Sequence, residues 1–239
     1  MGKMIYLDNA ATTKTAPEVV QAMLPYFSEY YGNPSSIYDF AGKSKEAVTK
    51  GREQIAEVLG AKKEEIYFTA GGSESDNMAL RGVVNASKKE KKHIITTKIE
   101  HHAILNTCEY ARKKGAEVTY LNVNPDGEIN IDELEKSIKE NTRLISVMFA
   151  NNEIGTIEPI AKIGRLARAY GITFHTDAVQ AFGHVPINVA RMNIDLMSVS
   201  AHKFNGPKGV GFLYVRNIDD FEPLIWGGGQ ENGKRSGTE

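Results

Sequence analysis

Apolar residues recur along this chain with two alternating spacings. Within 17–30 they return every three or four residues, which predicts an amphipathic helix, and Pro17 suits its first turn. Within 144–150 almost every residue is apolar, which is typical of a strand buried on both faces. The same two patterns predict further helices at 43–59, from 73 onward, and at 103–114, 131–140 and 160–170, and further strands at 65–69, 93–97, 117–123, 172–175, 195–200 and 210–215.

Strands that alternate with helices of this length indicate βαβ units. We therefore predict an α/β fold with a mainly parallel sheet flanked by helices. No helical pattern separates the strands at 195–200 and 210–215, so these two strands could form an antiparallel pair. The chain ends in a glycine-rich loop at 226–239, which suggests that a C-terminal part is missing.

Composition narrows the class of protein without naming an activity. The 239 residues are 41% hydrophobic and 25% charged, with a net charge of -1, so no broad basic field points to a nucleic-acid partner. No apolar run is long enough for a transmembrane helix, and we expect no membrane association. The single cysteine, Cys108, excludes an internal disulfide and favours a reducing compartment, so we expect a cytoplasmic protein.

Two residues at the ends of predicted strands could carry covalent chemistry. Lys203 follows the strand at 195–200 among serine, histidine and glycine residues. A lysine beside cationic groups can have a lowered pKa and form a Schiff base with an aldehyde, as it does with pyridoxal phosphate (PLP). That cofactor also needs an acidic partner for its ring nitrogen, and Asp177 lies just after the predicted strand at 172–175. A solvated loop lysine is the alternative interpretation of Lys203.

A pair of glycines followed by a serine marks a possible anion site. Gly71, Gly72 and Ser73 lie between the strand at 65–69 and the helix that follows. Free amide groups at a helix start favour a phosphate. The alternative is an ordinary capping box, in which Ser73 is the N-cap and Asp76 lies three residues further on.

Two more side chains follow predicted strands. The ring of His101 could stack on a cofactor ring, or it could simply begin a helix, and its neighbour His102 does not give the spacing of a zinc pair, so no metal site is predicted. Asn152 could donate to a phenolic oxygen of PLP, or it could belong to a turn. Because parallel strands deliver these loops to one edge of the sheet, we expect the side chains to meet there.

Six motifs in this order resemble the cysteine desulfurases of the NifS/IscS type, within the class V aminotransferase family. The similarity runs from Tyr6 to Thr238. The motifs are Asn9-Ala10-Ala11-Thr12-Thr13, Gly72-Ser73-Glu74-Ser75-Asp76-Asn77, Glu100-His101, Asn151-Asn152-Glu153-Ile154-Gly155, His175-Thr176-Asp177-Ala178-Val179-Gln180 and Ser200-Ala201-His202-Lys203.

The resemblance implies a fold and a role for each matched residue. It implies the large domain of a fold-type I PLP enzyme, which contains a seven-stranded sheet. This domain would occupy 16–239 and follow an N-terminal segment at 1–15. The C-terminal small domain would be absent from the chain. Lys203 would bind PLP and act as the base, and His101 would stack on the ring with a part in catalysis. The other implied cofactor contacts are Asp177 to the ring nitrogen, Gln180 and Asn152 to the phenolic oxygen, Gly72, Ser73, Ser200 and His202 to the phosphate, and Thr238 to the phosphate of a partner subunit.

The same resemblance implies a reaction and partners. The substrate would be L-cysteine, the product L-alanine, and the sulfur would pass to a protein persulfide for iron–sulfur cluster or other cofactor assembly. A homodimer and a sulfur-acceptor or scaffold protein would be the partners. The family's nucleophilic cysteine has no counterpart here, because Cys108 lies inside a predicted helix. A selenocysteine lyase, a small-amino-acid aminotransferase and a PLP-binding scaffold without turnover remain alternatives.

Overall fold

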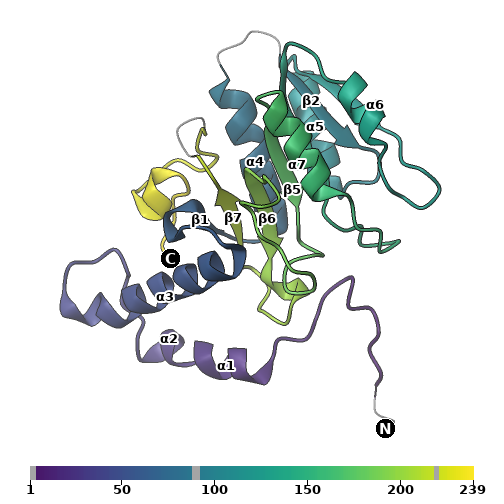
Figure 1. The fold of residues 1–239 in the computed structure, drawn as a ribbon. Helices are drawn as coiled ribbons and strands as arrows, with labels where there is room; N and C mark the ends of the chain where they lie inside the picture. Colours follow the sequence, from purple (N-terminus) through teal and green to yellow (C-terminus); the bar gives the residue numbers. More distant parts are fainter. Residues whose placement is uncertain (1–3, 88–91, 218–220) are drawn as a thin grey trace.

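The computed structural model describes residues 4–87, 92–217 and 221–239, and its centre is one seven-stranded sheet (Figure 1). The strand order is β1-β7-β6-β5-β4-β2-β3. The strands are β1 Ile66–Thr69, β2 His93–Thr97, β3 Glu117–Leu121, β4 Thr142–Ser146, β5 Thr173–Asp177, β6 Leu196–Ser200 and β7 Gly211–Val215. All pairings are parallel except those of β7, which runs antiparallel to both β6 and β1. The predicted α/β class, the mainly parallel sheet and the antiparallel pair near the end are confirmed.

Helices cover both faces of this sheet, as Figure 1 shows for α4 and α7. The helices are α1 Pro17–Met23, α2 Pro25–Ser28, α3 Gly42–Leu59, α4 Gly72–Ala86, α5 His102–Lys113, α6 Ile131–Lys136 and α7 Ile160–Ala169. Short 3-10 turns lie at Asp39–Ala41, Lys63–Glu65, Ala201–Lys203 and Gln230–Gly233. No helix within these described ranges has the length and apolar character needed to span a membrane.

The strands are apolar on both sides because each face has its own core. Ile94 packs with Met78 and Ile104, which come from α4 and α5. The next residue, Ile95, belongs to the other core, with Ile163 of α7. Successive side chains of a strand point to opposite faces, so a continuous apolar run fills both cores at once.

Several predicted elements end earlier than the sequence pattern suggested. The helix predicted at 17–30 breaks into α1 and α2, because Pro25 has no N–H to continue a helix and begins the second one instead. The strand predicted at 144–150 pairs only as far as Ser146, and the helix predicted at 131–140 stops at Lys136. The end of α3 agrees with the prediction, since Gly60 adopts φ +66° there.

The two ends of the chain are attached to the sheet domain by polar contacts. Glu231, which is 5% exposed, accepts two hydrogen bonds from Arg52, at 2.6 and 2.7 Å, and a third from the Phe68 amide of β1 at 2.8 Å. Near the N-terminus, Thr13 contacts the loop after β6. The predicted division at residue 15 stays a prediction.

Candidate functional site

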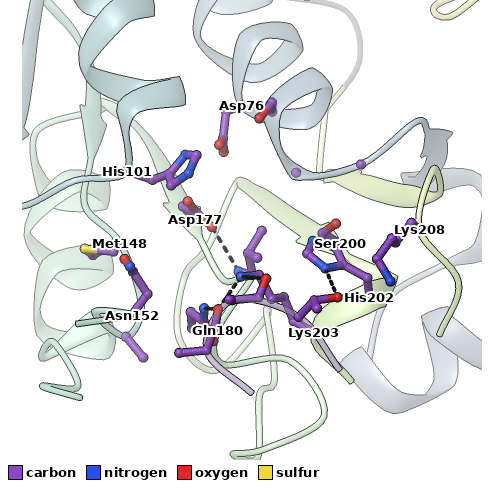
Figure 2. Close-up of a pocket in the computed structure, with 18 of the residues that line it drawn as sticks. Asp76, His101, Met148, Asn152, Asp177, Gln180, Ser200, His202, Lys203 and Lys208 are labelled. Atoms are coloured by element: carbon purple, nitrogen blue, oxygen red, sulfur yellow. Dashed lines mark hydrogen bonds between the residues drawn. The ribbon is translucent and has the colours of Figure 1, made fainter. Parts of the chain in front are cut away.

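A pocket of about 900 Å³ opens at the carboxyl ends of the parallel strands (Figure 2). Asp177 is the last residue of β5 and Ser200 the last residue of β6, and the loops after β1, β2 and β4 reach the same edge. The predicted site residues that line the pocket are Gly72, Ser73, His101, Asn152, Asp177, Gln180, Ser200, His202 and Lys203. Thr238, which was predicted to reach a partner subunit, does not line it.

One wall of the pocket is the start of α4. Gly71 precedes the helix at φ +143°, where glycine is favoured, and no side chain caps the helix. A Cβ added at Gly72 would lie 2.7 Å from Cγ2 of Val179, so only glycine fits there. The amides of Gly72 and Ser73 have no hydrogen-bond partner within the described part of the chain. Open amides at the start of a 15-residue helix suit an anion.

The capping-box alternative for this turn is wrong. Ser73 lies inside the first turn of α4 and makes no cap bond. Asp76 does not reach back to the helix start, because its side chain is 1% exposed and faces the sheet. Its Oδ1 lies 3.8 Å from Nε2 of His175.

Asp177 places a buried carboxyl in the wall of the pocket. Its Oδ1 accepts a hydrogen bond of 2.9 Å from the amide of Val179, and the residue is 5% exposed. Burial raises the pKa of Asp177, whereas the Val179 amide, His101 and Lys203 act in the opposite direction. A cationic group that entered the pocket would find a carboxyl already oriented by the backbone.

Lys203 closes the short 3-10 turn after β6 and points into the same pocket. Its Nζ donates to the carbonyl oxygen of Ala11 at 3.0 Å and also to that of Ala10. Partial burial lowers the pKa of Lys203, and the negative charges of Asp177, Asp8 and Glu153 oppose that change. A lowered pKa makes the unprotonated amine, which is the nucleophilic form, more accessible.

Hydroxyl, imidazole and ammonium groups line the pocket with the α4 start, and they belong to Ser200, His202 and Lys208. Ser200 is 5% exposed, and its Oγ would lie 3.5 Å from a Cβ at Gly71. Nδ1 of His202 is 3.0 Å from Oγ1 of Thr12. Burial lowers the pKa of His202, as do the nearby Lys203 and Lys208. Figure 2 shows this donor-rich group on the opposite side of the pocket from Asp177 and His101.

His101 begins a helix, as one interpretation of it predicted, while its stacking on a cofactor ring stays a prediction. It is the N-cap of α5, where its Nδ1 accepts a hydrogen bond from the amide of Ala103 at 3.1 Å, and its exposed ring also lines the pocket.

The amide side chains of Asn152 and Gln180 both form hydrogen bonds within the protein. Nδ2 of Asn152 donates to Glu153 at 2.6 Å, and Nε2 of Gln180 donates to the carbonyl of Ala10 at 2.9 Å.

This arrangement fits PLP group by group. The open amides with Ser200 and His202 suit a phosphate, Asp177 suits a protonated ring nitrogen, and Lys203 suits an aldehyde. No group of three or more histidine, cysteine, aspartate or glutamate side chains within residues 4–87, 92–217 and 221–239 is arranged to hold a metal ion.

Sequence reasoning missed two features of the pocket. The carbonyls of Ala10 and Ala11 hold Lys203, but backbone groups leave no side-chain signal. Asp76 was considered only as a member of the alternative capping box, although it lines the pocket. Its position three residues before the buried Ala79 and four before the buried Leu80 was the available signal that it faces inward.

Comparisons with known proteins agree with this site. The family model for aminotransferase class-V matches residues 5–236. A cysteine desulfurase IscS of Clostridium botulinum (strain Kyoto / Type A2) is 57% identical over 239 residues, which is 100% of this chain and 60% of that protein. A cysteine desulfurase IscS of Methanosarcina thermophila is 55% identical over 237 residues, which is 99% of this chain and 59% of that protein. This chain thus spans about 60% of the length of these curated relatives.

This chain covers a slightly larger share of two solved structures with the same fold. A structure described as SspA in complex with cysteine superposes with a TM-score of 0.97 at 45% identity, over 99% of this chain and 69% of that one. A NifS-like protein superposes with a TM-score of 0.96 at 43% identity, over 99% of this chain and 66% of that one. The fold is that of the fold-type I PLP enzymes. Since the family match covers nearly the whole chain and the pocket carries each group that the cofactor needs, this protein belongs to the aminotransferase class-V family of PLP-dependent enzymes.

Proposed function

We propose that this chain is the PLP-binding large domain, at 16–239, of a cysteine desulfurase that converts L-cysteine to L-alanine. The sulfur would pass to a protein persulfide for the assembly of iron–sulfur clusters or other sulfur-containing cofactors. The observation that carries the proposal is that Lys203 and Asp177 line one pocket whose opposite wall is the open start of α4. The names of the similar curated proteins support the choice of reaction.

The cofactor would be held at three points. Gly72, Ser73, Ser200 and His202 would bind the phosphate. The open α4 start supports this assignment, because Gly72 and Ser73 line the pocket and no side chain caps their amides. Asp177 would keep the ring nitrogen protonated. When bound, PLP supplies an aldehyde that captures an amine and a ring that accepts the electron pair left when a Cα proton is removed.

Lys203 would act as the base that takes the Cα proton of the substrate onto Nζ. A base must be uncharged when it accepts a proton, and the burial that lowers the pKa of Lys203 favours that state. The carbonyls of Ala10 and Ala11 give the ammonium form two acceptors, so the protonated product of this step would also have partners. His101 would cover the ring and take part in catalysis, while Asn152 and Gln180 would turn their amides to the phenolic oxygen.

A homodimer belongs to the same proposal. Thr238 is exposed and lies outside the pocket of its own chain, which supports its assignment to the phosphate of a partner subunit. A sulfur-acceptor or scaffold protein would receive the sulfur, and a cytoplasmic location stays a prediction.

Cys108 is not the sulfur-accepting thiolate. It is 0% exposed inside α5, and burial raises the pKa of its thiol to about 12. It is also the single cysteine of the sequence. These 239 residues by themselves are therefore expected to bind PLP without forming a persulfide at an enzyme-like rate. A selenocysteine lyase, a small-amino-acid aminotransferase and a non-catalytic PLP-binding scaffold remain the alternatives, which a substrate panel separates.

Borohydride reduction after incubation with PLP tests the central assignment. Peptide mapping should find the cofactor covalently attached at Lys203, and the Lys203→Ala variant should carry none. Lys208→Ala is the matched control, because Lys208 also lines the pocket but lies on the phosphate side. Attachment at Lys208, or the same labelling in the Lys203→Ala variant, would show that the proposal is wrong.

A further inference from the structure

Asp76 is a buried carboxyl that the proposed function leaves unused. It lies on α4 and lines the PLP pocket, and its side chain is 1% exposed. Oδ1 has no hydrogen-bond partner among the described residues. Figure 2 shows its carboxyl directed toward Asp177 and His101. A buried, incompletely bonded carboxyl costs free energy, so its retention beside the pocket requires an explanation.

A chain of buried polar side chains links Asp76 to the strands below it. The hydroxyl of Ser198 in β6 acts on Asp76 by favouring its charged form, and this Oγ lies 2.9 Å from Nε2 of His175, whose Nδ1 lies 2.9 Å from Oγ of Ser146. All of these residues are essentially inaccessible to solvent. Ser198 is also the direct strand partner of Asp177, so the chain runs beside that carboxyl.

Among the described residues, Asp76 forms no ion pair with a lysine or an arginine, and its one charged-group contact is with His175. Burial lowers the pKa of His175 to about 3, so its imidazole is neutral near pH 7. Burial also raises the pKa of Asp76, and the charge of Asp177 and that of Glu100 raise it further. Two neighbouring carboxyls in such an environment cannot both ionise without a large cost.

The surroundings decide which of the two carboxyls keeps the charge. Asp177 accepts the amide hydrogen of Val179 and faces His101 and Lys203, which favour its charged form. For Asp76, only the nearby Ser198 hydroxyl favours the charged form, and Oδ1 has no hydrogen-bond donor among the described residues. Charge therefore concentrates on Asp177.

We propose that Asp76 is the protonated, neutral member of a carboxyl pair with Asp177, and that it acts as a positioning residue by confining the single negative charge of the pair to Asp177. The proposal deepens the proposed function and rests on it, because Asp177 is the assigned partner of the ring nitrogen. One carboxylate then faces one ring cation, and the buried pocket keeps no unmatched charge.

Unfolding of the cofactor-free protein as a function of pH tests the protonation state directly. An acid that is neutral in the fold and ionised in the unfolded chain makes unfolding easier as pH rises. The unfolding constant of the wild type, divided by that of Asp76→Asn, should therefore grow by up to ~tenfold per pH unit above about pH 4. A ratio that does not change with pH would overturn the proposal. Where the asparagine variant fails to fold, the uncharged Asp76→Ser variant serves instead.

Glu100→Gln is the matched control for this measurement. It also removes a buried acid, but the pKa of Glu100 is raised to about 8, so its own effect should level off near that pH. A double variant of Asp76 and Glu100 should show both effects. If Glu100→Gln alone removed the whole pH dependence, the proposal for Asp76 would fail.

Cofactor affinity then shows which carboxyl carries the charge. At pH 7, Asp177→Asn should weaken PLP binding by ~tenfold or more, because it removes a charge-assisted hydrogen bond. Asp76→Asn should weaken it less than ~threefold, because both forms of the side chain are uncharged. Equal losses for both variants would overturn the proposal. If even the wild type failed to attach PLP at Lys203, the proposed function would be wrong, whereas the unfolding result would still decide the state of Asp76.

Discussion

Thr13 is joined to His202 by two hydrogen bonds of 2.8 Å, across 189 positions of sequence. Its amide and its hydroxyl both donate to the His202 carbonyl, and the hydroxyl in turn accepts the amide hydrogen of Asn205 at 2.8 Å. Lys203 lies between His202 and Asn205 in the sequence. The N-terminal segment therefore holds the backbone of the lysine turn as well as the lysine side chain.

Thr13→Val should loosen this turn with little change in volume. The substitution removes one hydrogen bond to His202 and leaves the amide of Asn205 without its acceptor, which costs about 1–3 kcal/mol of unfolding free energy. PLP affinity should fall as well, because Lys203 loses its fixed backbone. Urea denaturation and a PLP titration measure the two effects. Thr15→Val is the control, since its 3.3 Å bond to Gly206 lies beyond the lysine turn. Equal effects of the two variants on PLP affinity would contradict the argument.

Gly72→Ala should disturb the phosphate side of the pocket. The added Cβ would lie 2.7 Å from Cγ2 of Val179, and the amide of Val179 orients Asp177. We expect weaker PLP binding, measured by the absorbance of the bound cofactor during a titration. Gly42→Ala is the control, because a Cβ at that helical position meets no atom within 4 Å. Wild-type affinity in the Gly72→Ala variant would show that the turn tolerates a side chain.

Cys108 should be unreactive in the folded protein. The thiolate is the form that reacts, and burial raises the pKa of this thiol to about 12. A thiol reagent at pH 7 should therefore label the native protein only very slowly and the urea-unfolded protein completely, as measured by intact mass. Cys108→Ala should leave PLP attachment at Lys203 unchanged. Rapid labelling of the native protein would show that α5 opens or that the thiol is accessible.

Glu100 should make the protein less stable as pH rises. It is 5% exposed, and burial raises its pKa to about 8, so the folded protein keeps a proton that the unfolded chain releases. This contribution to stability is fully present below the unfolded pKa and is lost as pH rises toward about 8. Glu100→Gln should remove a slope of about 1.4 kcal/mol per pH unit from the unfolding free energy in that window. Parallel stability curves of the two proteins between pH 5 and pH 8 would contradict this assignment.

The sequence could predict the site residues that lie at the ends of strands. Asp177 and Ser200 end parallel strands, and such ends must meet at one edge of a sheet, so their juxtaposition could be predicted. Asp76 could not be assigned in this way. Its spacing to Ala79 and Leu80 indicates an inward-facing helical position, but only the packing of α4 on β5 and β6 places its carboxyl beside His175.

The pattern of apolar residues by itself determined the order of strands and helices, because burial on two faces requires continuous apolar strands and one-sided helices. Gly60 also marked the end of α3, because glycine permits a positive φ there, whereas the helical spacing concealed the break at Pro25. The tertiary structure alone decided that β7 inserts between β1 and β6, and that the carbonyls of Ala10 and Ala11 reach Lys203. These contacts join segments far apart in the chain through backbone groups, which every residue carries alike, so no side-chain pattern can encode them locally.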